Sequence, residues 1–319
     1  MKTLKNEQNP FPFSDSNKRY HTYDYALRHR YGGKVSKVVL DAGFTCPNID
    51  GTRGKGGCIY CSRRGSGDFS DPSLGLREQY EKQRSLLLQK WQPVGWIPYL
   101  QAHTNTYGTV EHLRAIYEEV LSFPDIVGIS VATRADCITP QIASLLAEVS
   151  LRTDLTVELG LQSVNDETAK RINRCHTYGE FLEGYGLLRA IAPRAQIAIH
   201  LINGLPGEDE AQMLATVQEV AALKPDQIKL HLLHVLKVTP LAELYLSGRY
   251  QPMEQDAYVR CVVKQLEWIP PQTVIGRITG DAPSDDLIAP LWSRKKLNVM
   301  NQIDKLMAKE NTWQGRFWM

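Results

Sequence analysis

The sequence predicts an α/β fold built on a parallel sheet. From about residue 35, short β-branched runs alternate with longer helical patterns, and six such strand–helix units follow one another. Repeated units of this kind form parallel sheets with right-handed crossovers. The pattern is compatible with either a partial barrel or a doubly wound sheet, and 319 residues suffice for one large domain or two ordinary ones.

Each predicted strand is a short run rich in β-branched residues. The candidates are 35–40, 96–102, 126–132, 155–160, 195–202 and 227–233. Helical patterns lie between them, at 77–91, 109–123, 139–150, 179–191 and 209–223. Thr139–Pro140 and Glu208–Asp209 are typical helix starts.

The two ends of the chain show the repeating pattern less clearly. Residues 1–34 carry aromatic and basic side chains and are expected to pack around the first strand. A less regular region follows the sixth strand, and beyond it a seventh strand is expected at 273–279 and a last helix at 297–310. We therefore expect an N-terminal extension at 1–34, a central sheet domain at 35–250 and a C-terminal extension at 251–319.

Composition limits the class of protein without naming an activity. Hydrophobic residues make up 43% and charged residues 23%, as in soluble globular proteins. The sequence has no apolar run long enough to cross a bilayer and no apolar signal core, so we expect a cytoplasmic protein. The net charge of +2 neither demands nor excludes a nucleic-acid partner. Basic residues that could hold RNA phosphates are nevertheless grouped near three cysteines and near the C-terminus: Arg53, Lys55, Arg63, Arg64, Arg294, Lys295 and Lys296.

Three of the six cysteines lie in the stretch CPNIDGTRGKGGCIYC, at Cys46, Cys58 and Cys61. A structural zinc site usually takes four ligands, and a redox dithiol needs only the Cys58–Cys61 pair. A [4Fe–4S] cluster held by three thiolates accounts for all three cysteines and leaves one iron open for a ligand. The remaining cysteines are scattered and are expected to be small core or near-site residues: Cys137, Cys175 and Cys261.

The loop with the three cysteines directly follows the first predicted strand, and the other strands also end in polar or glycine-rich segments. In barrel folds the chemistry lies at the carboxyl ends of the strands. Six strand ends on one rim, the cysteine loop included, therefore predict one functional site. The segments are His103–Thr106, Thr133–Asp136, Glu158–Ser163 and Asn203–Glu208, with Lys229, His231, His234 and Lys237 on and after the sixth strand.

At these positions the sequence resembles the radical S-adenosylmethionine superfamily, whose hallmark is a three-cysteine loop with an aromatic residue, here Tyr60, before the last cysteine. The long first gap between the cysteines and the stretch VELGLQSVNDETAKRINRCH (157–176) are similar to the branch of the Elongator catalytic-subunit-like enzymes. Over nearly the whole chain the sequence resembles the YhcC/YtqA-type family, in the blocks KRYHTYDYALRHRYGGKV, GGCIYC, SGDF, QAHTNTY, ATRADC, HLINGLPGE, KLHLLHVLK and RITGDAP. It departs from that family at Ala135, where proline is usual, at Cys175, where glycine or alanine is expected, and at Val238, where glycine is usual.

The resemblance implies a partial (β/α)6 TIM-like barrel with N- and C-terminal extensions, one [4Fe–4S] cluster and S-adenosylmethionine. Cys46, Cys58 and Cys61 would ligate the cluster, Tyr60 would lie beside the adenine, and Arg174 would hold the S-adenosylmethionine carboxylate. The other implied cofactor-binding residues are Thr104 and Asn105 for the amine, Glu158 and Gln162 for the amine or ribose, Asn203 and Gly204 for the adenosine, and Arg134 and Asp136. Candidates for the substrate side are His231, His234, Lys237, Arg277 and Asp281.

The resemblance also implies an activity. Members of the YtqA-like branch are associated with modification of the tRNA wobble uridine. The implied step converts 5-carboxymethylaminomethyl(-2-thio)uridine to 5-aminomethyl(-2-thio)uridine (the MnmL activity). The implied partners are tRNA, a flavodoxin or ferredoxin electron donor and a downstream tRNA methyltransferase. Three alternatives stay open: a radical enzyme acting on a small metabolite or peptide, a zinc-binding module, and an iron–sulfur electron-transfer protein.

Overall fold

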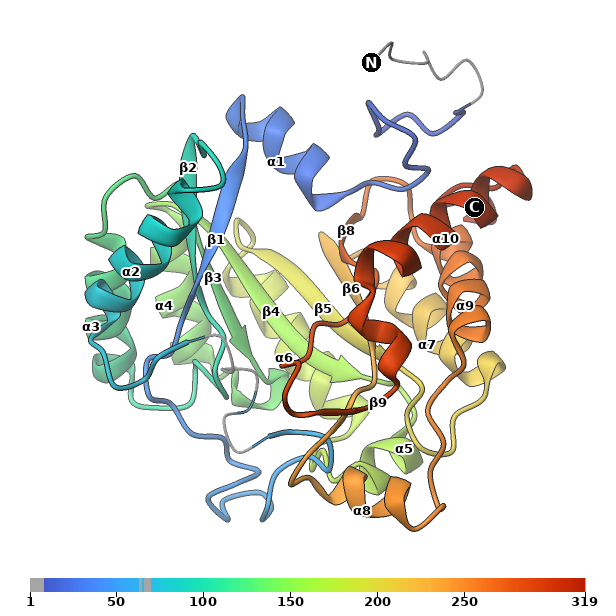
Figure 1. Cartoon of the computed structure of the whole chain (residues 1–319). Helices are drawn as coiled ribbons and strands as arrows, with labels where there is room; N and C mark the ends of the chain where they lie inside the picture. The colour runs from blue at the N-terminus through green and yellow to red at the C-terminus, as the bar shows by residue number, and fades with distance from the viewer. Residues whose placement is uncertain (1–8, 63–64, 66–69, 319) are drawn as a thin grey trace.

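Seven parallel strands form one curved sheet, a half-barrel, in the computed structural model, which describes residues 9–62, 65 and 70–318 (Figure 1). The strand order β1-β2-β3-β4-β5-β6-β8 adds each strand beside the preceding one. This order confirms the partial barrel, since a doubly wound sheet would add strands on both sides of β1. The strands are β1 (Val35–Leu40), β2 (Gly95–Leu100), β3 (Gly128–Thr133), β4 (Asp154–Gln162), β5 (Gln196–Asn203), β6 (Gln227–Leu232) and β8 (Val274–Arg277).

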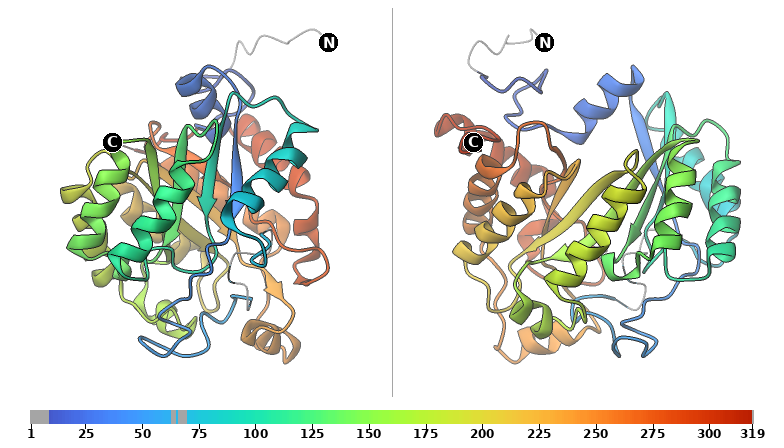
Figure 2. Two further views of the ribbon diagram at one scale, coloured as in Figure 1. Left: turned by 90° about the vertical axis from the view of Figure 1, so that its left-hand side faces the viewer. Right: turned by 180° about the vertical axis from the view of Figure 1, so that it is seen from behind.

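Helices cover the convex face of the sheet (Figure 2). The crossover helices are α2 (Leu76–Leu88), α3 (Val110–Leu121), α4 (Pro140–Ser150), α6 (Tyr178–Ile191) and α7 (Glu210–Ala222). The remaining helices are α1 (Tyr23–Tyr31), α5 (Asp166–Arg171), α8 (Pro240–Leu246), α9 (Gln255–Trp268) and α10 (Lys296–Lys309), with 3-10 turns at Ala135–Cys137 and Leu291–Arg294. In the described part of the chain, none of these helices has the length and apolar character needed to cross a membrane.

The hydrophobic core lies between the sheet and its helices. Alternate residues of each strand point to this side, and Val38, Ile199 and Leu230 are completely buried there. The helices contribute apolar stripes to the same core, such as Leu113 and Val120 of α3. The strand residues between these positions face the concave side, where Val35 and Ile97 form a small separate cluster with Leu27 of α1.

Both predicted helix starts are confirmed. Thr139 caps α4 by accepting a hydrogen bond from the main-chain N–H of Ile142, with Pro140 in the first turn. Asp209 and Gln212 form a reciprocal capping box at the start of α7. The caps fix the residues at which α4 and α7 begin. The loops that follow β3 and β5 are therefore short and lie at the carboxyl edge of the sheet.

The expectation of a less regular region after the sixth strand is wrong. That region holds α8 and α9, and a short antiparallel pair forms between β7 (Val235–Leu236) and β9 (Leu287–Ala289). Helix α9 buries Tyr258, Val262 and Leu266, which follow one another at four-residue spacing on one helical face. That spacing was the available signal for the helix.

The two extensions of the chain meet at the amino end of the sheet, where α1 lies (Figure 1). The main-chain N–H of Ile275 in β8 donates to the carbonyl of His21 at 2.7 Å. The side chain of Gln314 accepts from the N–H of His21 at 2.8 Å and donates to the carbonyls of Pro270 and Thr273. Residues from both termini therefore help to hold β8 beside β6.

Candidate active site

The loop with the three cysteines leaves β1 and lies at the carboxyl edge of the sheet (Figure 1). The main-chain N–H of Thr104, after β2, donates to the carbonyl of Thr45 at 3.2 Å. The N–H of Ile59 donates to the carbonyl of Ile172, just after α5, at 3.1 Å. The loop is therefore attached both to the rim of β2 and to the segment that follows β4.

Glycines allow this loop to fold tightly. A Cβ at Gly54 would lie 2.3 Å from Oδ1 of Asn48 and 2.6 Å from Sγ of Cys175. Gly56 and Gly57 have φ angles of +80° and +75°, in the left-handed region that glycine adopts without cost. The side chain of Cys175 consequently packs directly on the cysteine loop.

The three cysteines are partly exposed and form no disulfide among the described residues. A hydrogen bond with Cys61, the charge of Arg134 and the amide of Asn48, 3.6 Å from Sγ, outweigh burial and lower the pKa of Cys58 to about 7. Arg134 also interacts electrostatically with Cys46. Within the described residues, no three His, Cys, Asp or Glu side chains converge on one metal-ion position. Three cysteines on one loop, with the pKa of one of them lowered toward the thiolate form, have the donor chemistry that an iron–sulfur cluster takes.

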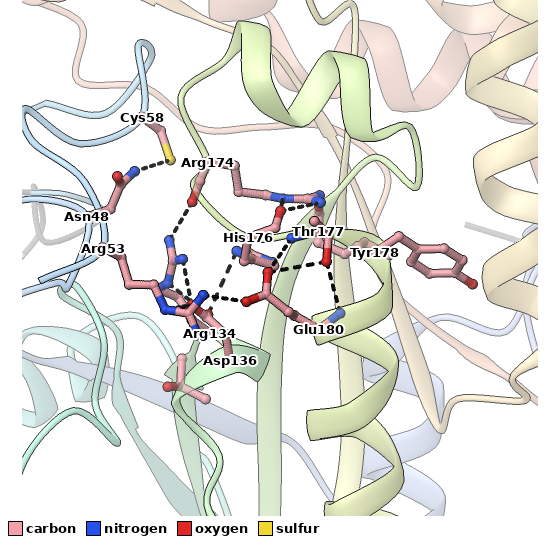
Figure 3. A network of polar contacts seen from close by, with 12 residues as sticks. Asn48, Arg53, Cys58, Arg134, Asp136, Arg174, His176, Thr177, Tyr178 and Glu180 are labelled. Carbon is pink, nitrogen blue, oxygen red and sulfur yellow. Dashed lines mark hydrogen bonds and ion pairs between the residues drawn. The ribbon is translucent and has the colours of Figure 1, made fainter.

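Arg134 and Asp136, which follow β3, form a buried ion pair beside the loop (Figure 3). Arg134 donates to both carboxylate oxygens, from Nε at 3.0 Å and from Nη2 at 2.9 Å. Its Nη1 donates to the main-chain carbonyl of Arg174 at 2.9 Å. The structure thus brings these two predicted cofactor residues next to the cysteine loop.

Arg174 lies beside the same loop, but its guanidinium mainly serves the backbone. It is completely buried and donates to the main-chain carbonyls of Leu161, Ser163 and His176. These contacts fix the end of β4 and the turn before α6 (Figure 3). Its predicted role at the S-adenosylmethionine carboxylate stays a prediction.

Thr104 and Asn105 are buried at the rim of β2. The amide nitrogen of Asn105 donates to the carbonyls of Ala102 and Ala132, at 2.9 and 3.0 Å. Its Oδ1 is buried and has no hydrogen-bond partner among the described residues. A buried acceptor of this kind suits an ammonium donor, as predicted for the cofactor amine. Tyr60 packs against the apolar cluster at the carboxyl ends of β5 and β6.

Glu158 is completely enclosed on the concave face of the sheet, and four donors surround its carboxylate. Lys37 donates to Oε1 at 2.5 Å. Tyr99 donates to Oε2 at 2.8 Å, His200 lies 2.7 Å from the same oxygen, and Lys229 also donates to it. Burial opposes ionisation, but Lys229 and Lys37 outweigh it and hold the pKa of Glu158 well below its usual value. A buried carboxylate needs such partners, and Glu158 has them.

Gln162 lies at a bulge between β4 and β5 and has a φ of +64°. Its amide lies over Gly160, where a Cβ would come within 2.7 Å of Nε2. A left-handed conformation at a non-glycine residue costs free energy and is common at functional sites. The bulge turns the Gln162 side chain along the rim, and its predicted contact with the amine or ribose stays a prediction.

Asn203 and Gly204 end β5 on the same rim. The amides of Asn203 and Gln265 exchange two hydrogen bonds of 2.8 Å, which attach β5 to α9. Gly204 has a φ of +87°, and its carbonyl accepts from Tyr250 at 2.8 Å. Asn203 is therefore engaged within the protein, whereas the rim position of Gly204 matches the expected one.

The predicted substrate-side residues separate into two groups. Four of them lie together: His231, His234, Arg277 and Asp281. Nη2 of Arg277 is 3.2 Å from the Asp281 carboxylate. His234 lies near both of these charges, and burial lowers its pKa to about 4. His231 Nε2 is buried and unpartnered among the described residues. Lys237 is exposed and donates to a loop carbonyl. The structure does not bring Lys237 to the other four.

Sequence reasoning gave no role to three residues of the concave face, Lys37, Tyr99 and His200. Each comes from the interior of a different strand and not from a strand end. The available signal was a single charged or imidazole side chain inside an otherwise largely apolar strand, Lys37 in VSKVVL and His200 in QIAIHLIN.

Family models match most of the chain. The Radical SAM superfamily model matches residues 49–220, and the Radical_SAM C-terminal domain model matches residues 225–309. YtqA of Bacillus subtilis (strain 168) is 46% identical over 98% of this chain and 97% of its own length. YhcC of Escherichia coli (strain K12) is 34% identical over 92% of this chain and 94% of its own length.

A solved structure shares the fold. The archaeal Methanocaldococcus infernus Elp3 with an N-terminal deletion has a TM-score of 0.66 at 18% identity. The match covers 88% of this chain and 64% of that chain. The sequence matches carry the family assignment, and the shared half-barrel agrees with it. The chain therefore belongs to the radical S-adenosylmethionine superfamily, in its YhcC/YtqA-type branch, and its cofactors are a [4Fe–4S] cluster and S-adenosylmethionine.

Proposed function

We propose that this radical S-adenosylmethionine enzyme converts the 5-carboxymethylaminomethyl group of the tRNA wobble uridine, with or without the 2-thio group, to 5-aminomethyl. The observation that carries the proposal is the similarity to YtqA over 98% of the chain. Modification of the wobble uridine is the activity that resemblance to this branch implies. The likeness in fold to an archaeal Elp3 agrees with the same branch.

The chain supplies a place for each part of this reaction. Cys46, Cys58 and Cys61 would hold the cluster, and the cofactors supply a 5′-deoxyadenosyl radical that takes a hydrogen atom from the glycine-derived methylene. The carbon-centred radical loses one further electron to a one-electron acceptor, the oxidised form of a flavodoxin or ferredoxin, and the adjacent nitrogen loses its proton to water, which gives an imine. Water then hydrolyses the resulting imine, which releases the two-carbon fragment as glyoxylate and leaves the aminomethyl group on uridine. The half-barrel positions the wobble base and limits access of water.

Exposed basic residues near the cysteine loop and the C-terminus would contact tRNA phosphates. Lys55 and Lys295 are exposed. Arg53 and Lys296 each pair with a carboxylate, and Arg294 donates to a main-chain carbonyl, so these three contribute less. Two further candidates lie outside the described residues: Arg63 and Arg64. A downstream tRNA methyltransferase is the expected partner for the aminomethyl product.

Nucleoside analysis tests the proposal. Anaerobically reconstituted enzyme, S-adenosylmethionine, reductant and tRNA bearing 5-carboxymethylaminomethyluridine should give 5′-deoxyadenosine and 5-aminomethyluridine together. A Cys58→Ala variant should give neither product. An unchanged carboxymethylaminomethyluridine pool, together with S-adenosylmethionine cleavage and no tRNA binding in a gel shift, would instead favour a small metabolite or peptide as substrate.

A further inference from the structure

The concave face of the half-barrel is polar through its middle layer. TIM-type barrels usually fill this space with branched apolar side chains. Here β5 and β6 present His200, Lys229 and His231 to the concave face, while the intervening Ile228 and Leu230 are completely buried on the other side. A polar layer at this place differs from that apolar filling and offers groups that can bind a polar ligand.

Three basic side chains stand next to one another in this layer. The sheet register pairs His200 of β5 with Lys229 of β6, and Lys229 with Arg277 of β8. Neighbouring parallel strands lie about 4.8 Å apart, so the three residues form a row across three strands. Lys37 of β1 faces them across the half-barrel, since both lysines reach the same carboxylate of Glu158.

Positive charge exceeds negative charge in this layer of the described residues. Lys37 and Lys229 share the single carboxylate of Glu158. Each ammonium group has three N–H donors, so both lysines keep donors that Glu158 does not use. Among the residues that the structure describes, Arg277 forms an ion pair with Asp281 alone, and Lys296 shares that carboxylate at 2.8 Å. Burial first, and then the charges of Lys37 and Arg277, lower the pKa of Lys229 to about 7 even though Glu158 opposes this. An additional anion would relieve that repulsion.

Two of the basic side chains around this layer reach accessible space. The side chain of Arg277 is 35% exposed and that of Lys37 is 18% exposed, although both lie on the concave face. The ring of His231 lies 5.0 Å from the ring of His200, and its buried Nε2 has no partner among the described residues. A donor or acceptor on a ligand would complete this group.

We propose that Lys37, Lys229 and Arg277 form a carboxylate-binding site on the concave face, which holds the carboxymethyl end of the substrate side chain. This inference rests on the proposed function and assigns the group that the enzyme uses to select its substrate. Arg277 offers a planar pair of donors for the two oxygens. The carboxylate would be held in the half-barrel below the cysteine rim, with the adjacent methylene directed toward that rim.

Binding of three anticodon stem-loops tests the site. They carry 5-carboxymethylaminomethyluridine, its primary amide, or plain uridine at the wobble position. Dissociation constants are measured by fluorescence anisotropy with reconstituted enzyme and S-adenosylmethionine but no reductant, so that no turnover occurs. Wild-type enzyme should bind the carboxylate form about tenfold more tightly than the amide form, as expected for one charged hydrogen-bonded contact. Arg277→Gln should reduce this ratio to about one, and Arg277→Lys should retain part of it.

Arg114→Gln is the matched control, because Arg114 is an ion-paired arginine on the outer surface. It should keep the wild-type ratio. A preference that persists in Arg277→Gln, or a wild-type enzyme that converts the substrate without preferring the carboxylate, would overturn the carboxylate site and leave the proposed function standing. A wild-type enzyme that neither binds nor converts any stem-loop would overturn both. A melting temperature for each variant guards against simple misfolding.

Discussion

At the scale of single residues, Glu158 is the charge on which the concave layer depends. Glu158→Gln would leave Lys37 and Lys229 without their shared counter-charge, so we expect the free energy of unfolding to fall by about 3–5 kcal/mol. Urea denaturation of the full chain measures this. Glu118→Gln is the control, since the pair of Glu118 with Arg152 is solvent-exposed and should contribute less than about 1 kcal/mol. Equal losses in the two variants would contradict the argument.

We expect the buried His176 to make the free energy of unfolding depend on pH. Burial first, and then the charges of Arg174 and Arg134, lower its pKa from 6.5 to about 2. Below pH 6.5 the unfolded chain therefore binds a proton that the folded chain does not, and stability falls as the pH falls. Between pH 7 and pH 5 this group should remove about 2 kcal/mol, a loss that His176→Gln lacks. Denaturation of both proteins at the two pH values, with exposed His29→Gln as control, checks the difference; parallel pH profiles would refute it.

At the scale of elements, the cysteine loop depends on close packing against the turn before α6. In Gly54→Ala the new methyl group would overlap Oδ1 of Asn48 and Sγ of Cys175, a strain of about 1–3 kcal/mol. We expect less than half of the wild-type iron content after anaerobic reconstitution. Gly75→Ala is the control, because nothing lies within 4 Å of its Cβ position. Full iron loading in Gly54→Ala would show that the loop adjusts without cost.

Elements were predictable from sequence where the signal was local. The caps at Thr139 and Asp209 mark helix starts within a few residues, and the structure has them as expected. Helix α9 lacks a side-chain cap at Glu254, so only its buried face identifies it. Cys175 and Val238, two departures from the family pattern, have φ angles of +57° and +59°, where glycine would be unstrained. The sequence shows that these residues differ from the family pattern. Only the structure shows why glycine is usual there, since the backbone is left-handed at both positions.

At the scale of the whole molecule, the cysteine loop could be predicted from the sequence and the polar layer around Glu158 could not. The cysteine loop was predictable because one segment carries all three thiols. The layer around Glu158 was not, because β1, β2, β5 and β6 each contribute one or two side chains from strand interiors. Sheet register and curvature decide which of these side chains face one another, and neither property can be predicted from the sequence of a single strand. The terminal extensions posed the same difficulty, since their contacts join residues almost 300 positions apart.

Gln314 tests whether the two extensions stabilise the half-barrel as one unit. Its completely buried amide joins the N-H of His21 to the carbonyls of Pro270 and Thr273, next to β8. Gln314→Ala would leave buried main-chain groups without partners, at about 1–3 kcal/mol for each unsatisfied group. We expect a single thermal transition, as in the wild type, shifted to lower temperature, because β8 is part of the main sheet. Exposed Gln89→Ala should leave the transition unchanged. A separate early transition in Gln314→Ala would mean that the C-terminal extension unfolds independently of the sheet.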